Sequence, residues 1–268
     1  MVGQAKLLNK LKSYTLKTLP QTIIFIGNKG CGKHTLVSEM RNYFNLDLID
    51  MSSNISLDYI NDIYTKALPA FYLINMDVLT EKQQNMILKF IEEPIKGSYI
   101  ILLSSNKANL LNTIVNRCII YTFDPYTREE LSNFIDKDLN ESDTNKILEL
   151  CSTPGQILST SLKNLEDLYK LCDNIIYKMS IANYSNALSI ANKINFKDEY
   201  DKFDIDIFFT ALLNKIKIEY FKSNDNRIFE LYNITLNYKK RLRDLRINKE
   251  MLIENFISYV WKFNKERI

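Results

Sequence analysis

The chain has 268 residues, of which 46% are hydrophobic and 25% charged, and its formal net charge is +3. This length allows one large domain or two to three small ones with packed cores, and the charge neither requires nor excludes a nucleic-acid partner. Because there is no apolar run of about eighteen residues and no signal-peptide pattern, we expect a cytoplasmic protein that does not contact a membrane.

Five short apolar runs in the first 125 residues predict β-strands. They are rich in β-branched and aromatic residues and mostly do not alternate with polar ones, which is typical of strands buried on both faces of a parallel sheet. The runs span residues 22–26, 46–50, 71–75, 99–105 and 119–123. Helical patterns lie between them, and in residues 80–94 Thr80 is the expected N-cap. Strands that alternate with helices predict an α/β doubly wound domain.

After Pro125 the pattern becomes helical. Short amphipathic segments come first, and Thr127 followed by Glu130 predicts a capping box at the start of one of them. From about residue 165 the chain is expected to be helical to its end. The predicted units are an α/β domain over 1–125, a small helical domain over 126–165 and a C-terminal helical domain over 166–268.

The segment GNKGCGKHT, which follows the first predicted strand, has the pattern of a phosphate-binding loop. Three of the six glycines of the chain fall within it, where the backbone needs positive φ or a close approach to a ligand. In a strand–loop–helix context, backbone N–H groups hold phosphate oxygens and the lysine reaches the outer phosphates. The candidate nucleotide-binding residues are Gly27, Asn28, Lys29, Gly30, Cys31, Gly32, Lys33, His34 and Thr35. The alternative is a glycine turn that only joins a strand to a helix.

His34 stands where this motif has serine or threonine. The missing hydroxyl normally ligates Mg²⁺, which prefers small oxygen ligands, whereas imidazole suits softer metals. Thr35 has a hydroxyl, but one residue later on a helix it points about 100° away. We therefore expect the Mg²⁺ ligand to be absent and His34 to be a neutral residue at the surface or the helix start.

The third predicted strand ends in Ile74 and Asn75, where an ATP-hydrolysing site has two acidic residues. Such a pair anchors Mg²⁺ and acts on the attacking water. Asp77 is the only acidic residue close by, and it lies further along the chain. The missing acidic pair and the presence of His34 together predict nucleotide binding without turnover, or no binding.

The four cysteines are far apart and never have C-x-x-C spacing. They are Cys31, Cys118, Cys151 and Cys172. Neither a zinc site nor a disulfide framework is indicated, so we expect scattered reduced thiols.

The segments INMDVLTEKQQNMILKFIEEP (74–94) and YIILLSSNKANLLNTIVNRC (99–118) resemble the bacterial clamp-loader family of DNA polymerase III, within the AAA+ ATPases. That family has a Q-N-x-L-L-K-x-[LI]-E-E-P helix after the third strand and a Ser-Arg-Cys motif before the fifth strand. Here the second motif reads Asn-Arg-Cys and contains Arg117. The resemblance covers about residues 1–160 and is closest to the delta-prime subunits. It implies an AAA+ P-loop domain, a helical lid and a helical collar.

The resemblance also implies roles for individual residues. Arg117 would be supplied in trans to the ATP site of a neighbouring subunit, where it stabilises charge on the transferring phosphoryl group; the alternative is a salt-bridged surface arginine. Ser104 or Ser105 would be the sensor residue at the end of the fourth strand. In CSTPGQIL (151–158), Gln156 takes the place of an arginine that often contacts the γ-phosphate. The zinc-binding cysteines of the family are absent, so no zinc is implied.

By resemblance, the chain is expected to be a delta-prime-like stator in the hetero-oligomeric clamp loader of a DNA polymerase III-type holoenzyme, a nucleotidyltransferase complex. ATP or ADP could occupy the loop, but Mg²⁺ binding and hydrolysis are expected to be weak or lost. The implied partners are motor and delta-like subunits, the sliding clamp and, through the assembly, primer–template DNA. A gamma/tau-like motor that hydrolyses ATP, with Thr35 recruited for Mg²⁺, and a P-loop interaction module outside replication remain alternatives.

The segment YKKRLRDLRINKE (238–250) is basic and is predicted to lie along one helix. Its lysines and arginines could attract the phosphates of DNA. They could equally form a solvated helix face with i,i+4 pairs.

Overall fold

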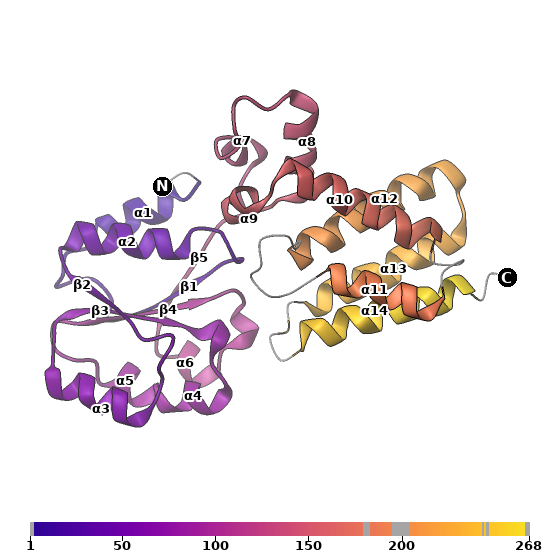
Figure 1. The fold of residues 1–268 in the computed structure, drawn as a ribbon. Coiled ribbons are helices and arrows are strands. Elements are labelled where there is room, and N and C mark those ends of the chain that lie inside the picture. The colour runs from indigo at the N-terminus through magenta and orange to yellow at the C-terminus, as the bar shows by residue number, and fades with distance from the viewer. Residues whose placement is uncertain (1–2, 179–182, 195–203, 243, 245–246, 266–268) are drawn as a thin grey trace. The chain divides into compact units, whose positions relative to one another are not determined.

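The computed structural model describes residues 3–178, 183–194, 204–242, 244 and 247–265. The chain divides into two compact units (Figure 1). The first unit comprises Met1–Phe134 with Thr153–Gly155, and the second comprises Ile135–Ser152 with Gln156–Ile268. The three-unit division expected from the sequence stays a prediction.

A parallel sheet of five strands forms the centre of the first unit. The strands are β1 (Thr22–Ile26), β2 (Asp47–Asp50), β3 (Ala70–Asn75), β4 (Tyr99–Ser104) and β5 (Ile119–Thr122). Their order is β2-β3-β4-β1-β5, so β1 lies between β4 and β5 and Phe25 is in register with Leu103 and Tyr121. All five predicted strands are confirmed to within one residue at each end, and so is the α/β fold class.

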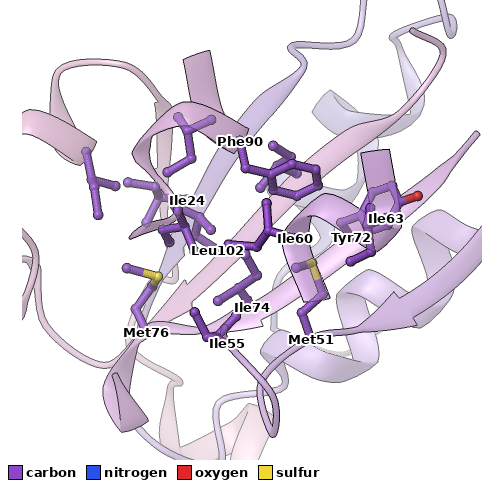
Figure 2. Close-up of a cluster of buried hydrophobic side chains, with 14 of the residues drawn as sticks. Ile24, Met51, Ile55, Ile60, Ile63, Tyr72, Ile74, Met76, Phe90 and Leu102 are labelled. Atoms are coloured by element: carbon purple, nitrogen blue, oxygen red, sulfur yellow. The ribbon is translucent and has the colours of Figure 1, made fainter. Parts of the chain in front are cut away.

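Helices cover both faces of this sheet (Figure 1). They are α1 (Ala5–Lys12), α2 (Lys33–Phe44), α3 (Leu57–Lys66), α4 (Glu81–Met86), α5 (Leu88–Glu92) and α6 (Asn112–Val115), with α7 (Arg128–Ser132) after the last strand. Successive side chains of a strand point to opposite faces, so each strand contributes to two apolar clusters. On one face Ile24 and Leu102 pack with Ile60 of α3 and Phe90 of α5 (Figure 2). On the other face Phe25 and Leu103 pack with residues of α1 and α2.

The predicted helix over residues 80–94 forms with one interruption. Thr80 caps α4 as expected: its hydroxyl accepts a hydrogen bond from the N–H of Gln83, and the Gln83 side chain accepts one from the N–H of Thr80. The interruption is at Ile87, whose ψ of −6° tightens the turn between α4 and α5. Ile87 and Phe90 are nonetheless both buried in the core. The Thr127 capping box of α7 is confirmed as well.

All the regular elements in the described residues of the second unit are helices. Its helices are α8 (Glu141–Leu150), α9 (Pro154–Ser159, which begins in the first unit), α10 (Leu162–Asp173), a π-helical turn (Asn174–Lys178), α11 (Tyr184–Lys193), α12 (Ile205–Ser223), α13 (Asn226–Arg241) and α14 (Lys249–Lys265). Helix α12 has seven buried side chains, and its Phe208 and Phe209 pack edge-on against Phe256 of α14. No helix in the described part of the chain combines the length and the apolar character that crossing a membrane requires.

The prediction of one basic helix over residues 238–250 is wrong. Helix α13 ends at Arg241, and α14 begins only at Lys249. The new start has a physical cause, because the side chain of Asn248 accepts hydrogen bonds from the N–H groups of Glu250 and Met251, at 2.9 and 3.2 Å, and so caps a separate helix. Residues 243, 245 and 246 of this segment lie outside the described residues.

Candidate functional site

The phosphate-loop segment follows the carboxyl end of β1 and is built on close backbone packing. The N–H of Gly27 donates to the carbonyl of Ser104 at 3.1 Å, which extends the pairing between β1 and β4 by one residue. A Cβ atom on Gly27 would lie 2.7 Å from the Cys31 sulfur and 2.8 Å from Cβ of Phe123. Glycine is therefore required here for steric reasons, whether or not the loop holds a ligand.

The other two glycines of the loop set its turn. Gly30 and Gly32 have φ values of +80° and +93°, in the left-handed region that favours glycine. Gly32 is the N-cap of α2, so the helix begins at Lys33 as the motif predicts. The first N–H groups of a helix have no carbonyl partner within it, and this end of α2 therefore favours negative charge.

The Lys33 side chain folds back onto the loop. It is only 9% exposed, and its Nζ donates to the carbonyl oxygens of Gly27 and, at 3.2 Å, Asn28. Burial lowers the pKa of Lys33, while the charges of Cys31 and Asp77 partly oppose this shift. His34 and Thr35 are both exposed in the first turn of α2.

The ends of β3 and β4 meet beside this loop through Asp77. Its carboxylate accepts hydrogen bonds from the hydroxyl of Ser104 at 3.0 Å and from the N–H of Ser105 at 2.9 Å. Ser104 is fully buried, and the electrostatic influence of Asp77 reaches Lys33. The sequence offered Asp77 only as a nearby acid. The position of Asp77 could have been predicted, because the carboxyl ends of neighbouring parallel strands share one edge of the sheet.

Residues 153–155 also contact the loop, which the sequence did not predict. The N–H of Gly155 donates to the carbonyl of Gly30 at 3.0 Å, and the hydroxyl of Thr153 donates to the carbonyl of Lys29 at 3.1 Å. A Cβ atom on Gly155 would lie 2.6 Å from Cα of Gly30, so the two backbones touch. The pairing joins positions 125 residues apart, and a glycine in each segment was the only sequence signal.

Gln156, which stands where the family often has arginine, is engaged within the second unit. Its side-chain oxygen accepts a hydrogen bond from the N–H of Ser152 at 2.8 Å. Its amide nitrogen donates to the carboxylate of Asp206 at 3.3 Å. These bonds give Gln156 a structural role in joining α9 to α12.

Arg117 follows α6 and lies at the other end of the sheet from the loop. Its carbonyl accepts a hydrogen bond from the hydroxyl of Thr22 at 2.9 Å, and Thr22 is the first residue of β1. Because Gly27 follows the last residue of that strand, Arg117 is separated from the loop by the length of β1, roughly 16 Å. The structure therefore brings Asp77, Ser104 and Ser105 to the loop but leaves Arg117 apart from it.

The guanidinium of Arg117 lies at the wall of a surface cavity of about 350 Å³. The cavity is lined by Gln21, Thr22, Ile91, Glu92, Pro94 and Arg117. The Nε atom of Arg117 pairs with the Glu92 carboxylate at 2.6 Å, and Nη1 donates to the carbonyl of Thr113 at 2.8 Å. The side chain of Arg117 is 41% exposed, so other molecules can reach it.

The four cysteines are free thiols. Burial raises the pKa of Cys118 to about 11 and that of Cys172 to about 12. In the part of the chain that the structure describes, no group of three or more histidine, cysteine, aspartate or glutamate side chains could hold a metal ion.

Comparison with known proteins gives two similarities in sequence and one similarity in fold. Residues 64–127, which include Asp77, Glu92 and Arg117, match the family described as DNA polymerase III, delta subunit. The chain is 29% identical over 115 residues to DNA polymerase III subunit delta′ of Buchnera aphidicola, a match that spans 41% of this chain and only 32% of that relative. The crystal structure of a DNA polymerase III gamma subunit-related protein from Thermotoga maritima has the same fold, with a TM-score of 0.51 and 16% identity, over 96% of this chain and 99% of that one.

The family match falls on the segments that carry the sequence resemblance, and the five-stranded parallel sheet with helices on both faces fits the AAA+ fold. The chain is thus similar to subunits of the DNA polymerase III clamp loader, to the delta-subunit family over residues 64–127 and to a delta-prime subunit over 115 residues.

Proposed function

We propose that this chain is a delta-prime-like stator of a clamp loader, whose Arg117 completes the ATP site of a neighbouring subunit. The observation that carries the proposal is the position of Arg117. It lies a strand length from the loop of its own chain, is partly exposed and borders an open cavity. An arginine placed in this way can serve phosphates bound by another molecule, but it cannot reach those bound at residues 27–35 of its own chain.

The chemistry of guanidinium fits this role. Arginine stays charged at every physiological pH, and its planar fork of N–H groups matches phosphate oxygens. An arginine that enters from a neighbouring subunit stabilises the charge that develops on a transferring phosphoryl group, and this contributes about 10³- to 10⁵-fold to the rate in well-studied nucleotide hydrolases.

Hydrolysis at the loop of this chain is proposed to be weak or absent. His34 replaces the hydroxyl that would ligate Mg²⁺, and Asn75 ends β3 where an acidic residue would be needed. Lys33 is engaged with carbonyl oxygens of its own loop, and Gly155 packs against Gly30. The loop retains its glycine geometry, so ATP or ADP binding is compatible with the proposal, with Mg²⁺ poorly held.

The proposed partners follow from the similarity to clamp-loader subunits. They are motor and delta-like subunits in a hetero-oligomer, the sliding clamp and, through the assembly, primer–template DNA. The whole set remains a proposal, because the match covers about a third of the curated relative. The C-terminal helical domain predicted over residues 166–268 is the proposed collar through which the subunits assemble.

The proposal is tested by reconstitution. A loader assembled without this chain should fail to place the clamp on primed DNA, and adding the chain back should restore loading. The Lys33→Ala variant should restore it as well as the wild type does, whereas the Arg117→Ala variant should restore little. If the isolated chain hydrolysed ATP in a manner that depends on Lys33, the stator role would be wrong and a motor role correct.

A further inference from the structure

The side chain of Arg117 is held at two points by its own chain. Glu92 pairs with Nε at 2.6 Å, and the carbonyl of Thr113 accepts from Nη1 at 2.8 Å. Because the guanidinium group is planar and rigid, two contacts at different nitrogens restrict its plane as well as its position. A long arginine side chain that is otherwise free to change rotamer is therefore oriented before any partner arrives.

The backbone that carries Glu92 is itself fixed. Glu92 is the last residue of α5, and the two residues before it, Phe90 and Ile91, are buried in the core. The hydroxyl of Tyr64 donates to the carbonyl of Glu93 at 2.9 Å, which fastens the chain immediately after the helix. The Glu92 carboxylate is thus presented from a rigid support.

The Glu92–Arg117 pair contributes little to folding stability. Both side chains are more than 40% exposed, and ion pairs in such positions are weak because water and salt screen them. Both residues instead line the cavity described above, beside Gln21 and Pro94. The pair is therefore placed where it controls how Arg117 meets a group that enters the cavity.

We propose that Glu92 is a positioning residue for Arg117, holding the guanidinium at the cavity wall for phosphates bound by a neighbouring subunit. This inference rests on the proposed function of Arg117. Donors that are oriented in advance stabilise a transition state better than donors that must be ordered during the reaction. Removing the charge of Glu92 loosens the guanidinium and slows hydrolysis, without weakening the binding of ATP to the neighbour.

The test compares two neighbouring glutamates in the complete clamp loader. In Glu92→Gln, the kcat of clamp- and DNA-stimulated ATP hydrolysis should fall about tenfold, with the KM for ATP within about twofold of the wild-type value. The control Glu93→Gln removes the same charge from the next residue, which is exposed and outside the cavity lining, and should leave both constants within about twofold. Both variants should have the wild-type melting temperature, so that a loss of folding is not mistaken for a loss of positioning.

A second pair of variants separates this inference from the proposed function. Adding Glu92→Gln to Arg117→Ala should produce no further loss, because Glu92 acts only through Arg117. If Arg117→Ala slows hydrolysis while Glu92→Gln does not, or if Glu92→Gln still slows it in the Arg117→Ala background, the positioning role of Glu92 is wrong and the role of Arg117 stands. If Arg117→Ala leaves the rate unchanged, the proposed function itself fails.

Discussion

The N–H of Gly155 donates a hydrogen bond to the carbonyl of Gly30 at 3.0 Å, so residues 153–155 pack directly on the phosphate-loop segment. Neither position has room for a side chain, because a Cβ atom on Gly155 would lie 2.6 Å from the Gly30 Cα. The contact joins two backbones, which cannot yield as the tip of a flexible side chain could. It follows that this pairing is sensitive to a single methyl group.

Gly155→Ala is expected to lower the free energy of unfolding by about 1–3 kcal/mol, the usual cost of forcing extra atoms into a packed site. Denaturant unfolding measures the change. Leu158→Ala is the matched control, because Leu158 lies in the same helix and is 73% exposed, and it should change the free energy by less than about 0.5 kcal/mol. Equal stability of Gly155→Ala and the wild type would show that the loop and residues 153–155 are not packed as described.

Asp77→Ala is expected to destabilise the first unit by about 1–3 kcal/mol, because the buried hydroxyl of Ser104 and the half-buried N–H of Ser105 lose their carboxylate acceptor. Urea unfolding measures the loss. Asp47→Ala is the control: Asp47 is an exposed aspartate at the start of β2, and its substitution should have little effect. If the two variants were equally stable, Asp77 would not join the ends of β3 and β4.

The stability of the chain is expected to fall in alkaline solution, and Cys172 contributes to this. Burial raises the pKa of its thiol from 9.0 to about 12, with smaller effects from Lys215 and Asp173. The folded state therefore keeps this proton between about pH 9 and 12, where the unfolded state has lost it, and the free energy of unfolding falls as pH rises. The stabilisation is fully present below pH 9.

Cys172→Ala removes this titration. Between pH 9 and 11 its free energy of unfolding should fall less steeply than that of the wild type. The two slopes should differ by up to about 1.4 kcal/mol per pH unit. Val260→Ala, which also removes buried atoms but no titrating group, should be less stable at every pH with an unchanged slope. A wild-type slope in Cys172→Ala would mean that the thiol ionises normally in the folded protein.

Local patterns in the sequence were sufficient to predict the strands, the Thr80 N-cap, the Thr127 capping box and the start of α2. These features depend on residues close together in the chain: the apolar run of β1, the pair Thr80 and Gln83, and the glycine before Lys33. The parallel pairing follows from the fold class that this pattern indicates, whereas the strand order β2-β3-β4-β1-β5 was not predicted.

Contacts between distant segments could not be predicted in the same way. Nothing in the local pattern of Glu92 indicates that its partner is Arg117, and Gly155 has no feature that points to Gly30. The prediction of one helix over the basic segment 238–250 was wrong for a different reason, because charge alone does not reveal that Asn248 caps a new helix. In each case tertiary packing or a cap decided the outcome.

The measurement that tests the account most directly is the clamp- and DNA-stimulated ATPase of the complete loader, with Arg117→Ala and Lys33→Ala introduced separately into this chain. Hydrolysis at the neighbouring site should fall by about 10³-fold or more with Arg117→Ala, followed under single-turnover conditions, and stay close to the wild-type rate with Lys33→Ala. The opposite pattern, an unchanged rate with Arg117→Ala and a lost one with Lys33→Ala, would show that residues 27–35 form a working ATP site and that this chain does not act by serving its neighbour.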